Sequence, residues 1–326
     1  MNDQPSALRR FGQRIARPCK NARSVLRCAL WSSPIVGTRL NRAWFKRRYL
    51  DYHGEPLRLD PPVGFNEHIV HRILYERDPI FRRMCDKIAV RAIIRERLGE
   101  DFAVPLLGQW ADPREIDWEA LPERFVLKPN HASGLVAIVH DKATCDNAAL
   151  TRLAQGWLQR DYYDRSREWG YRGIPRRLVV EPLLVGADGG GAPEAVVLTF
   201  GGRAVAIRVL TGIKDTPSRR DNWFDCNGRR LPFHSRKYTL GDFELEPALA
   251  RRLADAAGTV AEGCAHLRVD FYLTDAGLKI GELTPYHGAG QTPWSLPGCD
   301  RLFGRFWRDP SEIDRTPDLV AALHAA

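Results

Sequence analysis

Residues 267–284 read LRVDFYLTDAGLKIGELT, and this stretch decides the fold. Two short runs rich in β-branched, aromatic and other apolar residues flank Asp275-Ala276-Gly277. Three-residue hairpin loops commonly end with a glycine in the left-handed conformation. The stretch therefore predicts a β-hairpin whose loop is residues 275–277.

Counting outward from this loop places Asp270 opposite Glu282, and Arg268 opposite Thr284. Side chains that lie directly across from each other share one face of a hairpin. The other face is predicted to be core, and it receives Val269, Phe271, Leu273 and Leu283. The hairpin is therefore expected to gather one arginine and two carboxylates on its polar face.

Two carboxylates placed opposite each other repel unless a cation lies between them. Mg²⁺ prefers hard carboxylate oxygens, usually one or two from the protein together with phosphate oxygens. The planar guanidinium of Arg268 suits a phosphate or a developing acyl-phosphate. The pair Asp270 and Glu282 is therefore interpreted as a metal site; the alternative is that Arg268 simply neutralises two surface acids.

The rest of the chain alternates helical and strand patterns. Residues 65–98 are helical in pattern, with Gly99 ending the last helix, and 151–169 and 248–262 are also expected to be helices. Strands are predicted at 125–128, 135–139, 177–184, 195–200, 203–210 and in the hairpin, and 211–247 is expected to be a loop. The class is α/β or α+β with largely antiparallel sheets.

Lys128 ends an apolar strand and precedes a small-residue loop that contains Ser133 and Gly134. Such a loop lets backbone N–H groups approach a phosphate, although a lysine at an exposed strand end is the simpler interpretation. Glu181 interrupts another apolar strand, where the neighbouring backbone is able to serve an adenine edge. His131 and His287 are candidate general bases or plain loop histidines.

The net charge of +9 is concentrated at the N-terminus. Residues 1–50 hold twelve Lys or Arg and one acid, a local charge of +11, whereas the remainder has 37 basic and 39 acidic residues. This segment is interpreted as a solvated arm or a contact for anionic lipid, with an acidic partner also open. Nucleic acid ranks last, because no recognised binding motif follows the segment.

The seven cysteines are scattered and include no C-x-x-C pair, which predicts neither a zinc site nor a disulfide framework. A reducing cytoplasm is therefore the expected location. No run of about eighteen apolar residues predicts a transmembrane helix, and no secretory signal is evident at the N-terminus.

Taken together, these pieces resemble the ATP-grasp superfamily, in particular its teichuronopeptide-biosynthesis (TupA-like) branch. The resemblance covers about residues 65–304. It is carried by FNEHI (65–69), DPIFRRMCDKIAVR (78–91), VPLLG (104–108), FVLKPNHASG (125–134), REWGY (167–171), VVEPLL (179–184) and RVDFYLTDAGLKIGELT (268–284). It implies two α+β subdomains that grip ATP between antiparallel sheets. The implied division is a basic segment at 1–55, then a catalytic domain at 56–326 with subdomains at about 110–180 and 181–326.

The resemblance also implies roles at individual positions. Lys87 and Lys128 match the lysines that hold ATP phosphates, beside the loop with Ser133 and Gly134. Glu181 matches the acid at the adenine hinge, where Leu183 offers its backbone, and Glu194 or Asp188 matches the ribose-side acid. Asp270 and Glu282, with Thr284 as a further candidate, match Mg²⁺ ligands, and Arg268 matches the arginine that steadies the transferred phosphoryl group.

Three features depart from the pattern. Many ATP-grasp enzymes have asparagine where this chain has Thr284, and the hydroxyl is a weaker ligand for a second metal. The branch often has a lysine where this chain has Val196. Only about 60 residues, mostly basic, precede the match, whereas many relatives carry a separate substrate domain there.

The resemblance implies a ligase that uses ATP and Mg²⁺ to activate a carboxylate as an acyl-phosphate, which an amine then attacks. The expected substrates are an amino acid or amine and a sugar acid of capsular or cell-surface polysaccharide. Arg219, Arg220, Arg229 and Arg230 either attract such polyanions or are solvated loop residues. A kinase that phosphorylates a hydroxyl and a non-catalytic nucleotide-binding scaffold are the alternatives.

Overall fold

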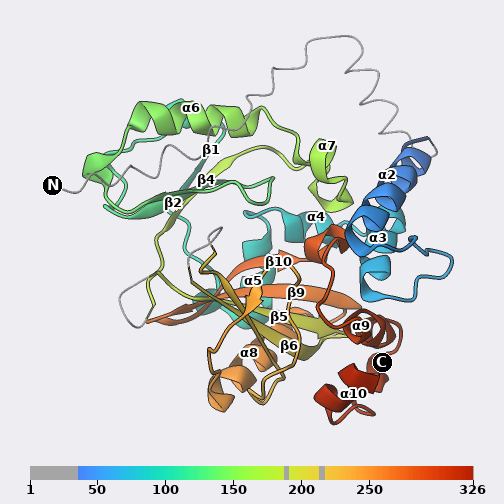
Figure 1. Ribbon diagram of the computed structural model, residues 1–326. Helices are drawn as coiled ribbons and strands as arrows, with labels where there is room; N and C mark the ends of the chain where they lie inside the picture. The colour runs from blue at the N-terminus through green and yellow to red at the C-terminus, as the bar shows by residue number, and fades with distance from the viewer. Residues whose placement is uncertain (1–35, 187–190, 213–216, 326) are drawn as a thin grey trace. The chain divides into compact units, whose positions relative to one another are not determined.

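The computed structural model describes residues 36–186, 191–212 and 217–325 (Figure 1). Two compact units divide the chain at Leu40, and the sites below all lie in the second unit, residues 41–326. Most of the basic segment, residues 1–35, and the ribose-side candidate Asp188 lie outside the described residues. No described helix is both long and apolar enough to cross a membrane.

The first sheet has four strands in the order β1-β4-β2-β3, and every neighbouring pair is antiparallel. The strands are β1 (Gly108–Trp110), β2 (Phe125–Pro129), β3 (Ala137–Val139) and β4 (Leu178–Pro182). Helix α6 (Asn147–Leu158) lies along one face of this sheet (Figure 1). Trp157 and Ala154 of α6 pack there with alternate strand residues such as Phe125 and Leu178.

Side chains alternate between the two faces of the first sheet along β2 and β4, so that one face is apolar and the other is polar. Phe125 and Leu127 join the core under α6, so Lys128 projects to the opposite face. Glu181 projects to that same face, because Val180 of its strand belongs to the core. The first sheet therefore presents Lys128 and Glu181 together on the side away from α6.

The second sheet has six strands in the order β10-β9-β5-β6-β7-β8, antiparallel except for the β7–β8 pair. The strands are β5 (Glu194–Phe200), β6 (Arg203–Thr211), β7 (Arg220–Phe224), β8 (Thr239–Leu240), β9 (His266–Thr274) and β10 (Gly277–Thr284). The β5–β6 hairpin turns at Gly201-Gly202, as predicted, and both glycines have positive φ, 57° and 75°. Two largely antiparallel sheets in an α/β chain confirm the predicted fold class.

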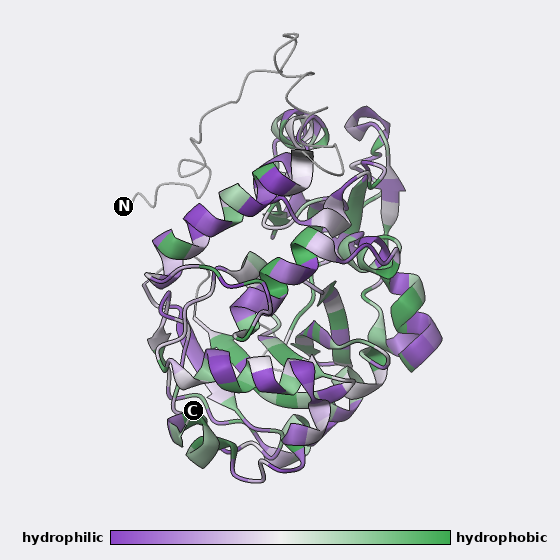
Figure 2. Cartoon of the chain, turned by 90° about the vertical axis from the view of Figure 1, so that its right-hand side faces the viewer, coloured by the Kyte–Doolittle hydropathy of each residue, from purple (hydrophilic) through white to green (hydrophobic). Residues whose placement is uncertain are grey.

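Helices bury the apolar side of the second sheet. Leu253, Ala257 and Val260 of α8 (Pro247–Val260) are fully buried, and α8 lies below β5 and β6 (Figure 1). The other described helices are α2 (Val36–His53), α3 (Phe65–Tyr75), α4 (Ile80–Cys85), α5 (Val90–Leu98), α7 (Tyr162–Ser166), α9 (Gly298–Arg308) and α10 (Leu319–Ala325). Hydropathy colouring shows green strands inside and helices that carry both colours (Figure 2).

An aromatic cluster joins α3 and α9 to the second sheet. Phe65 of α3 lies within 6.1 Å, centroid to centroid, of Phe200, Trp294 and Phe303. Short 3-10 helices of three or four residues lie in the connections between these elements: η2 (Glu100–Phe102), η3 (Pro113–Glu115), η4 (Lys142–Thr144), η5 (Trp169–Tyr171), η6 (His287–Gly290) and η7 (Pro310–Ile313). The buried rings of Phe65 and Trp294 also contact the ring of His287, so this aromatic cluster fixes the segment that follows β10.

Two predicted elements are wrong in detail. The predicted loop 211–247 contains β7, whose buried Asp221 and Asn222 conceal the apolar signal expected of a strand. The helix predicted at 151–169 ends at Leu158, because Asp161 caps a separate helix, its carboxylate accepting from the Tyr163 N–H at 3.0 Å. The prediction that Gly99 ends the preceding helix is confirmed, with φ at 90°.

Candidate active site

The β9–β10 hairpin places Asp270 directly opposite Glu282 and Arg268 opposite Thr284, as predicted. The loop itself was predicted wrongly, since Gly277 pairs with Thr274 and only two residues form the turn. A bulge between Ile280 and Glu282 restores the register by leaving Gly281 out of the pairing. The expected core face is confirmed, because Val269, Phe271 and Leu283 are buried.

Gly281 is needed at the bulge because a neighbouring ring fills the space. A Cβ on this residue would lie 2.5 Å from Cε2 of Tyr272. The Tyr272 ring in turn lies 5.9 Å from Nζ of Lys128, at cation–π distance. The polar face of the second sheet therefore meets the polar face of the first sheet at Lys128 and Tyr272.

Asp270 and Arg268 form an ion pair on this face, with Arg268 Nε donating to Asp270 Oδ1 at 2.6 Å. The two side chains are 24% and 23% exposed, so the pair borders open space. Burial and the Glu282 charge hold the pKa of Asp270 above its ordinary value despite Arg268. Burial also acts to raise the pKa of Glu282, but the positive charges of Lys87 and Arg268 outweigh it and lower that pKa.

Thr284 acts on Glu282 as a donor: its Oγ1 donates to Glu282 Oε1 at 2.9 Å. This hydrogen bond orients the carboxylate, and it is a different role from the direct metal ligand proposed from the sequence. Within the described residues, no three His, Cys, Asp or Glu side chains converge as a ready metal site. The two opposed carboxylates fit a Mg²⁺ ion that takes its other ligands from phosphate and water.

Lys128 and Glu181 meet on the polar face of the first sheet, with Lys128 Nζ 2.5 Å from Glu181 Oε2. Arg91 of α5 contacts the other carboxylate oxygen at 2.5 Å. Burial alone would raise the pKa of Glu181, but these two cations outweigh it and lower that pKa. Glu181 is therefore ionised, and it fixes Lys128 at the centre of the site.

Lys87 lies between α4 and α5, beside the loop that follows β2. Its Nζ donates to the Ala132 carbonyl at 2.5 Å, and its backbone N–H donates to the Asn130 carbonyl at 3.2 Å. Asn130, which is 1% exposed, ties the two segments together by donating to Asp86 Oδ1 at 2.8 Å and accepting from the Arg177 N–H at 2.8 Å. Burial lowers the pKa of Lys87, with Glu282 acting in the opposite direction.

The loop after β2 holds Ser133 and Gly134, the latter with φ at 74°. The Ser133 hydroxyl acts on Tyr162 of α7, where it opposes the rise in pKa that burial causes. This loop, Lys87 and Lys128 thus lie close together, the arrangement expected for phosphate contacts. His131 is 3% exposed, its Nε2 lies 3.2 Å from the Arg160 carbonyl, and burial lowers its pKa.

The predicted adenine and ribose residues lie at the ends of strands. Leu183 follows β4, and its N–H donates to the Arg124 carbonyl at 3.4 Å. Because this N–H is already used, the Leu183 carbonyl is the group better placed to accept a hydrogen bond from adenine. Glu194 begins β5, and its carboxylate accepts from Arg219 Nη2 at 2.7 Å. Glu194 shares the polar face of the sheet with Tyr272, its neighbour across β9.

Sequence reasoning missed several polar residues at the site. Glu168 is 7% exposed, and burial together with the charge of Glu282 raises its pKa to about 8. Arg91 pairs with Glu181, and Arg208 of β6 pairs with Asp221. Arg91 and Glu168 lie within DPIFRRMCDKIAVR and REWGY, two of the stretches that carry the family resemblance, so the sequence could have indicated them. Arg208 lies in no such stretch, and nothing in the sequence pointed to it.

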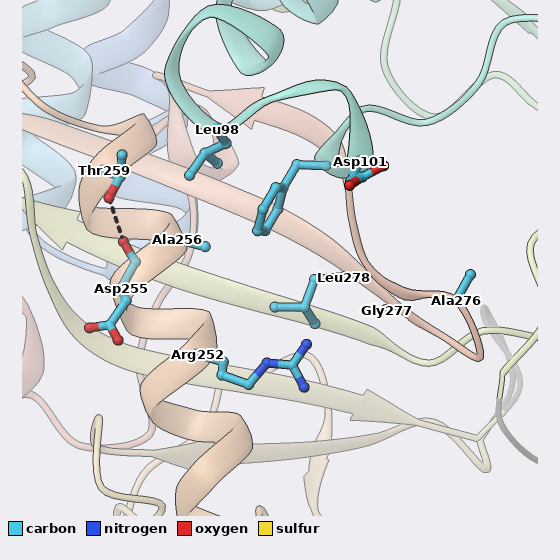
Figure 3. Close-up of a pocket in the computed structure, with 10 residues that line it drawn as sticks. Leu98, Asp101, Arg252, Asp255, Ala256, Thr259, Ala276, Gly277 and Leu278 are labelled. Atoms are coloured by element: carbon cyan, nitrogen blue, oxygen red, sulfur yellow. Dashed lines mark hydrogen bonds between the residues drawn. The ribbon is translucent and has the colours of Figure 1, made fainter.

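A pocket of 420 Å³ lies elsewhere (Figure 3). It is lined by α8, the turn of the hairpin and the segment after α5, including Leu98, Arg252 and Leu278. Leu278 lies on the core side of β10, the side opposite Asp270 and Glu282. This pocket is therefore separate from the charged site.

A family model described as TupA-like ATP-grasp matches residues 67–307. The chain belongs to this TupA-like ATP-grasp family. The match spans both sheets and includes Lys87, Lys128, Glu181, Asp270 and Glu282. Among curated proteins, none matches the chain.

Solved structures similar to this ATP-grasp chain include three enzymes of low sequence identity. D-alanine–D-alanine ligase from Bacillus anthracis, complexed with ATP, is 17% identical with a TM-score of 0.42, over 85% of this chain and 75% of that one. The VanG D-Ala:D-Ser ligase from Enterococcus faecalis is 14% identical with a TM-score of 0.38, over 69% and 56%. The ADP complex of an N5-carboxyaminoimidazole ribonucleotide synthetase is 10% identical with a TM-score of 0.36, over 62% and 45%.

Proposed function

We propose that this ATP-grasp chain is a carboxylate–amine ligase that consumes ATP and releases ADP and phosphate. The observation that carries the proposal is the opposition of Asp270 and Glu282 on one face, with Arg268 paired to Asp270 and the charge of Lys87 acting on Glu282. Lysines that neutralise phosphates beside two carboxylates suit phosphoryl transfer, in which the protein contributes positioning and charge.

The residues of the site divide the work by position. Lys87 and Lys128, with the loop at Ser133 and Gly134, would hold the phosphates. The carbonyl of Leu183 would meet the adenine, and Glu194 would meet the ribose. Arg268 would stabilise the γ-phosphoryl group as the substrate carboxylate attacks it, and the amine would then displace phosphate from the acyl carbon.

Asp270 and Glu282 are the side chains that would hold Mg²⁺. When bound, Mg²⁺ neutralises phosphate charge and orients the oxygens that are transferred. Thr284 would act through Glu282, since its hydroxyl fixes one carboxylate oxygen. Glu181 would act through Lys128, because it neutralises and positions the ammonium group.

We infer that the acid substrate is a sugar acid of capsular or cell-surface polysaccharide, and that the amine is an amino acid or a simple amine. The family resemblance supports this substrate class. The basic residues 1–50 favour a polyanionic substrate or a peripheral contact with anionic lipid at the cytoplasmic face. Nucleic acid is not a proposed partner.

An ADP-release screen tests the proposal. The full-length protein with Mg-ATP is incubated with uronic and sugar acids, each alone and with each of the twenty amino acids, and products are identified by mass spectrometry. We expect ADP release and an amide product only when both an acid and an amine are present. ADP formed with a hydroxylic acceptor alone would establish a kinase, and Mg-ATP binding without turnover on any pair would establish a scaffold.

A further inference from the structure

The row of residues that crosses the second sheet through Asp270 contains a further cation. Asp270 faces Glu282 on one side and Val196 of β5 on the other, and Val196 in turn faces Arg208 of β6. Directly opposed residues share one face of a sheet, so Arg208 lies on the same face as both carboxylates. Neighbouring strands are about 4.8 Å apart, which puts the Arg208 backbone about 10 Å from that of Asp270.

Arg208 is held rigidly at that position. Its Nε donates to Asp221 Oδ1 at 2.6 Å and its Nη2 donates to Asp221 Oδ2 at 3.0 Å. Asp221 is fully buried and also accepts from the Ser235 N–H at 2.8 Å. The guanidinium carbon lies 5.5 Å and 5.4 Å from the ring centroids of Trp223 and Tyr238. The carboxylate and the two rings therefore fix the plane of the guanidinium.

Anchoring by Asp221 uses one edge of the guanidinium. Within the described part of the chain, Nη1 of Arg208 donates to no protein group, and the side chain retains 11% exposure. An arginine whose fork is held on one edge is preorganised to bind a carboxylate through its remaining N–H groups. The residue between it and Asp270, Val196, offers no polar side-chain atom to compete.

The surroundings of Arg208 contain further polar atoms that the protein leaves without a partner. Among the described residues, Trp223 Nε1, Trp294 Nε1 and His287 Nδ1 are buried and make no hydrogen bond. Trp294 links them, since its ring lies 5.4 Å from Trp223 and 5.8 Å from His287. Both Arg268 and Arg208 act electrostatically on His287. Both arginines thus act on His287, whose ring stacks on this buried group of tryptophans, and the group carries three polar atoms without a hydrogen bond.

We propose that Arg208 is a substrate-binding residue that holds a carboxylate of an acceptor substrate beside Asp270 and Arg268. This inference rests on the proposed ligase function, in which either partner can carry such a group. The carboxylate belongs either to the acid that is activated or to the amino acid whose amine attacks. Asp221 is a positioning residue, because it acts on the substrate only through Arg208.

Calorimetric titration of the full-length protein, saturated with Mg²⁺ and a non-hydrolysable ATP analogue, tests this site. The probes for the acid are D-glucuronate and D-galacturonate, with D-glucose as the neutral counterpart. The probes for the amine substrate are glycine and L-alanine, with methylamine as the counterpart that lacks a carboxylate. Arg208→Met removes the charge, and Arg208→Lys keeps a charge opposite Asp221 but removes the planar fork, so that folding is preserved.

We expect at least one carboxylate probe to bind the wild type about tenfold or more tightly than either variant, since a charge-assisted bidentate contact is lost. Loss confined to the uronates assigns Arg208 to the acid, and loss confined to the amino acids assigns it to the amine substrate. Binding of the ATP analogue stays unchanged in both variants. Arg203→Met, on the same strand in an exposed pair with Asp314, is the matched control and leaves every affinity unchanged.

Equal affinity of a carboxylate probe for wild type and both variants would overturn the assignment, as would failure of every carboxylate probe to bind the wild type. If the variants lost affinity for D-glucose by the same factor as for D-glucuronate, Arg208 would have a merely structural role. These outcomes are distinct from failure of the ligase proposal. A protein that binds uronates through Arg208 but phosphorylates a hydroxyl would retain this site and lose that function.

Discussion

Asp270 lies opposite Glu282 because the bulge at Gly281 compensates for a two-residue turn at the end of the hairpin. Without the bulge, continuous pairing from Gly277–Thr274 would place Asp270 opposite Gly281. Because side chains alternate along a strand, Glu282 would then lie on the core face. One unpaired glycine therefore decides whether the two carboxylates can share a cation.

Removal of the Asp270 charge should abolish turnover without unfolding the protein. In Asp270→Asn the amide retains an oxygen for Arg268 Nε, and the side chain lies on the polar face. We expect a fall in kcat of at least about 100-fold, the usual cost of losing a group that stabilises developing charge. Thermal unfolding should be nearly unchanged. Asp275→Asn, in the exposed turn of the same hairpin, is the matched control, and a fully active Asp270→Asn would remove the metal assignment.

A side chain at Gly281 should weaken ATP binding through Tyr272. Gly281→Val places atoms where the Tyr272 ring lies and displaces it from Lys128. A cation–π contact is worth about 1–2 kcal/mol, so its loss should raise the KM for ATP by about 5- to 30-fold. Steady-state kinetics at saturating acceptor measure this. A KM for ATP equal to that of the wild type would show that Tyr272 does not position Lys128.

Asn130 should contribute to the stability of the fold. Asn130→Ala leaves Asp86, the Pro175 carbonyl and the Arg177 N–H without their shared partner. We expect the free energy of unfolding to fall by about 2–4 kcal/mol, because buried polar groups lose their hydrogen bonds. Urea denaturation measures the loss, and Asn227→Ala, at an exposed turn, is the control. Equal effects of the two substitutions would contradict this role for Asn130.

Acid should destabilise the fold through His68. This residue is 8% exposed, its ring stacks on Trp307 at 5.3 Å, and burial lowers its pKa from 6.5 to about 4. The unfolded state therefore binds the proton more tightly. The stability present above pH 6.5 is lost as pH falls toward 4, by about 2 kcal/mol between pH 7.5 and pH 5. His68→Phe should reduce this pH dependence by that amount, and an unchanged slope would contradict it.

The parts of the fold that could be predicted from sequence are those fixed by local pattern. The β5–β6 turn at Gly201-Gly202 and the end of α5 at Gly99 were predicted from their glycines. Glycine adopts positive φ at little cost, so it is the usual residue where a turn or a helix end needs that conformation. The pairing of Asp270 with Glu282 was predicted through an error, since a three-residue loop and a bulged two-residue turn give the same register. The alternating pattern alone does not distinguish them.

The parts that could not be predicted depend on residues distant in sequence. Strand β7 was missed because Asp221 and Asn222 are buried polar residues, whose burial is stabilised by partners such as Arg208 and Arg230. Arg208 itself looked like an ordinary strand residue until the strand order placed it in the row of Asp270. The resemblance placed Glu181 at the adenine hinge, but its ion pairs with Lys128 and Arg91 join segments distant in sequence and could not be predicted.

In the proposed reaction, the substrate carboxylate becomes an acyl-phosphate, and the amine displaces phosphate from its acyl carbon. This reaction is tested most directly by following ¹⁸O from a uronate labelled in both carboxylate oxygens, with Mg-ATP and the amino acid that supports ADP release. Attack of the carboxylate on the γ-phosphate and its displacement by the amine should leave one ¹⁸O in inorganic phosphate and one in the amide. Unlabelled phosphate, or a phosphorylated sugar with no free phosphate, would contradict the account.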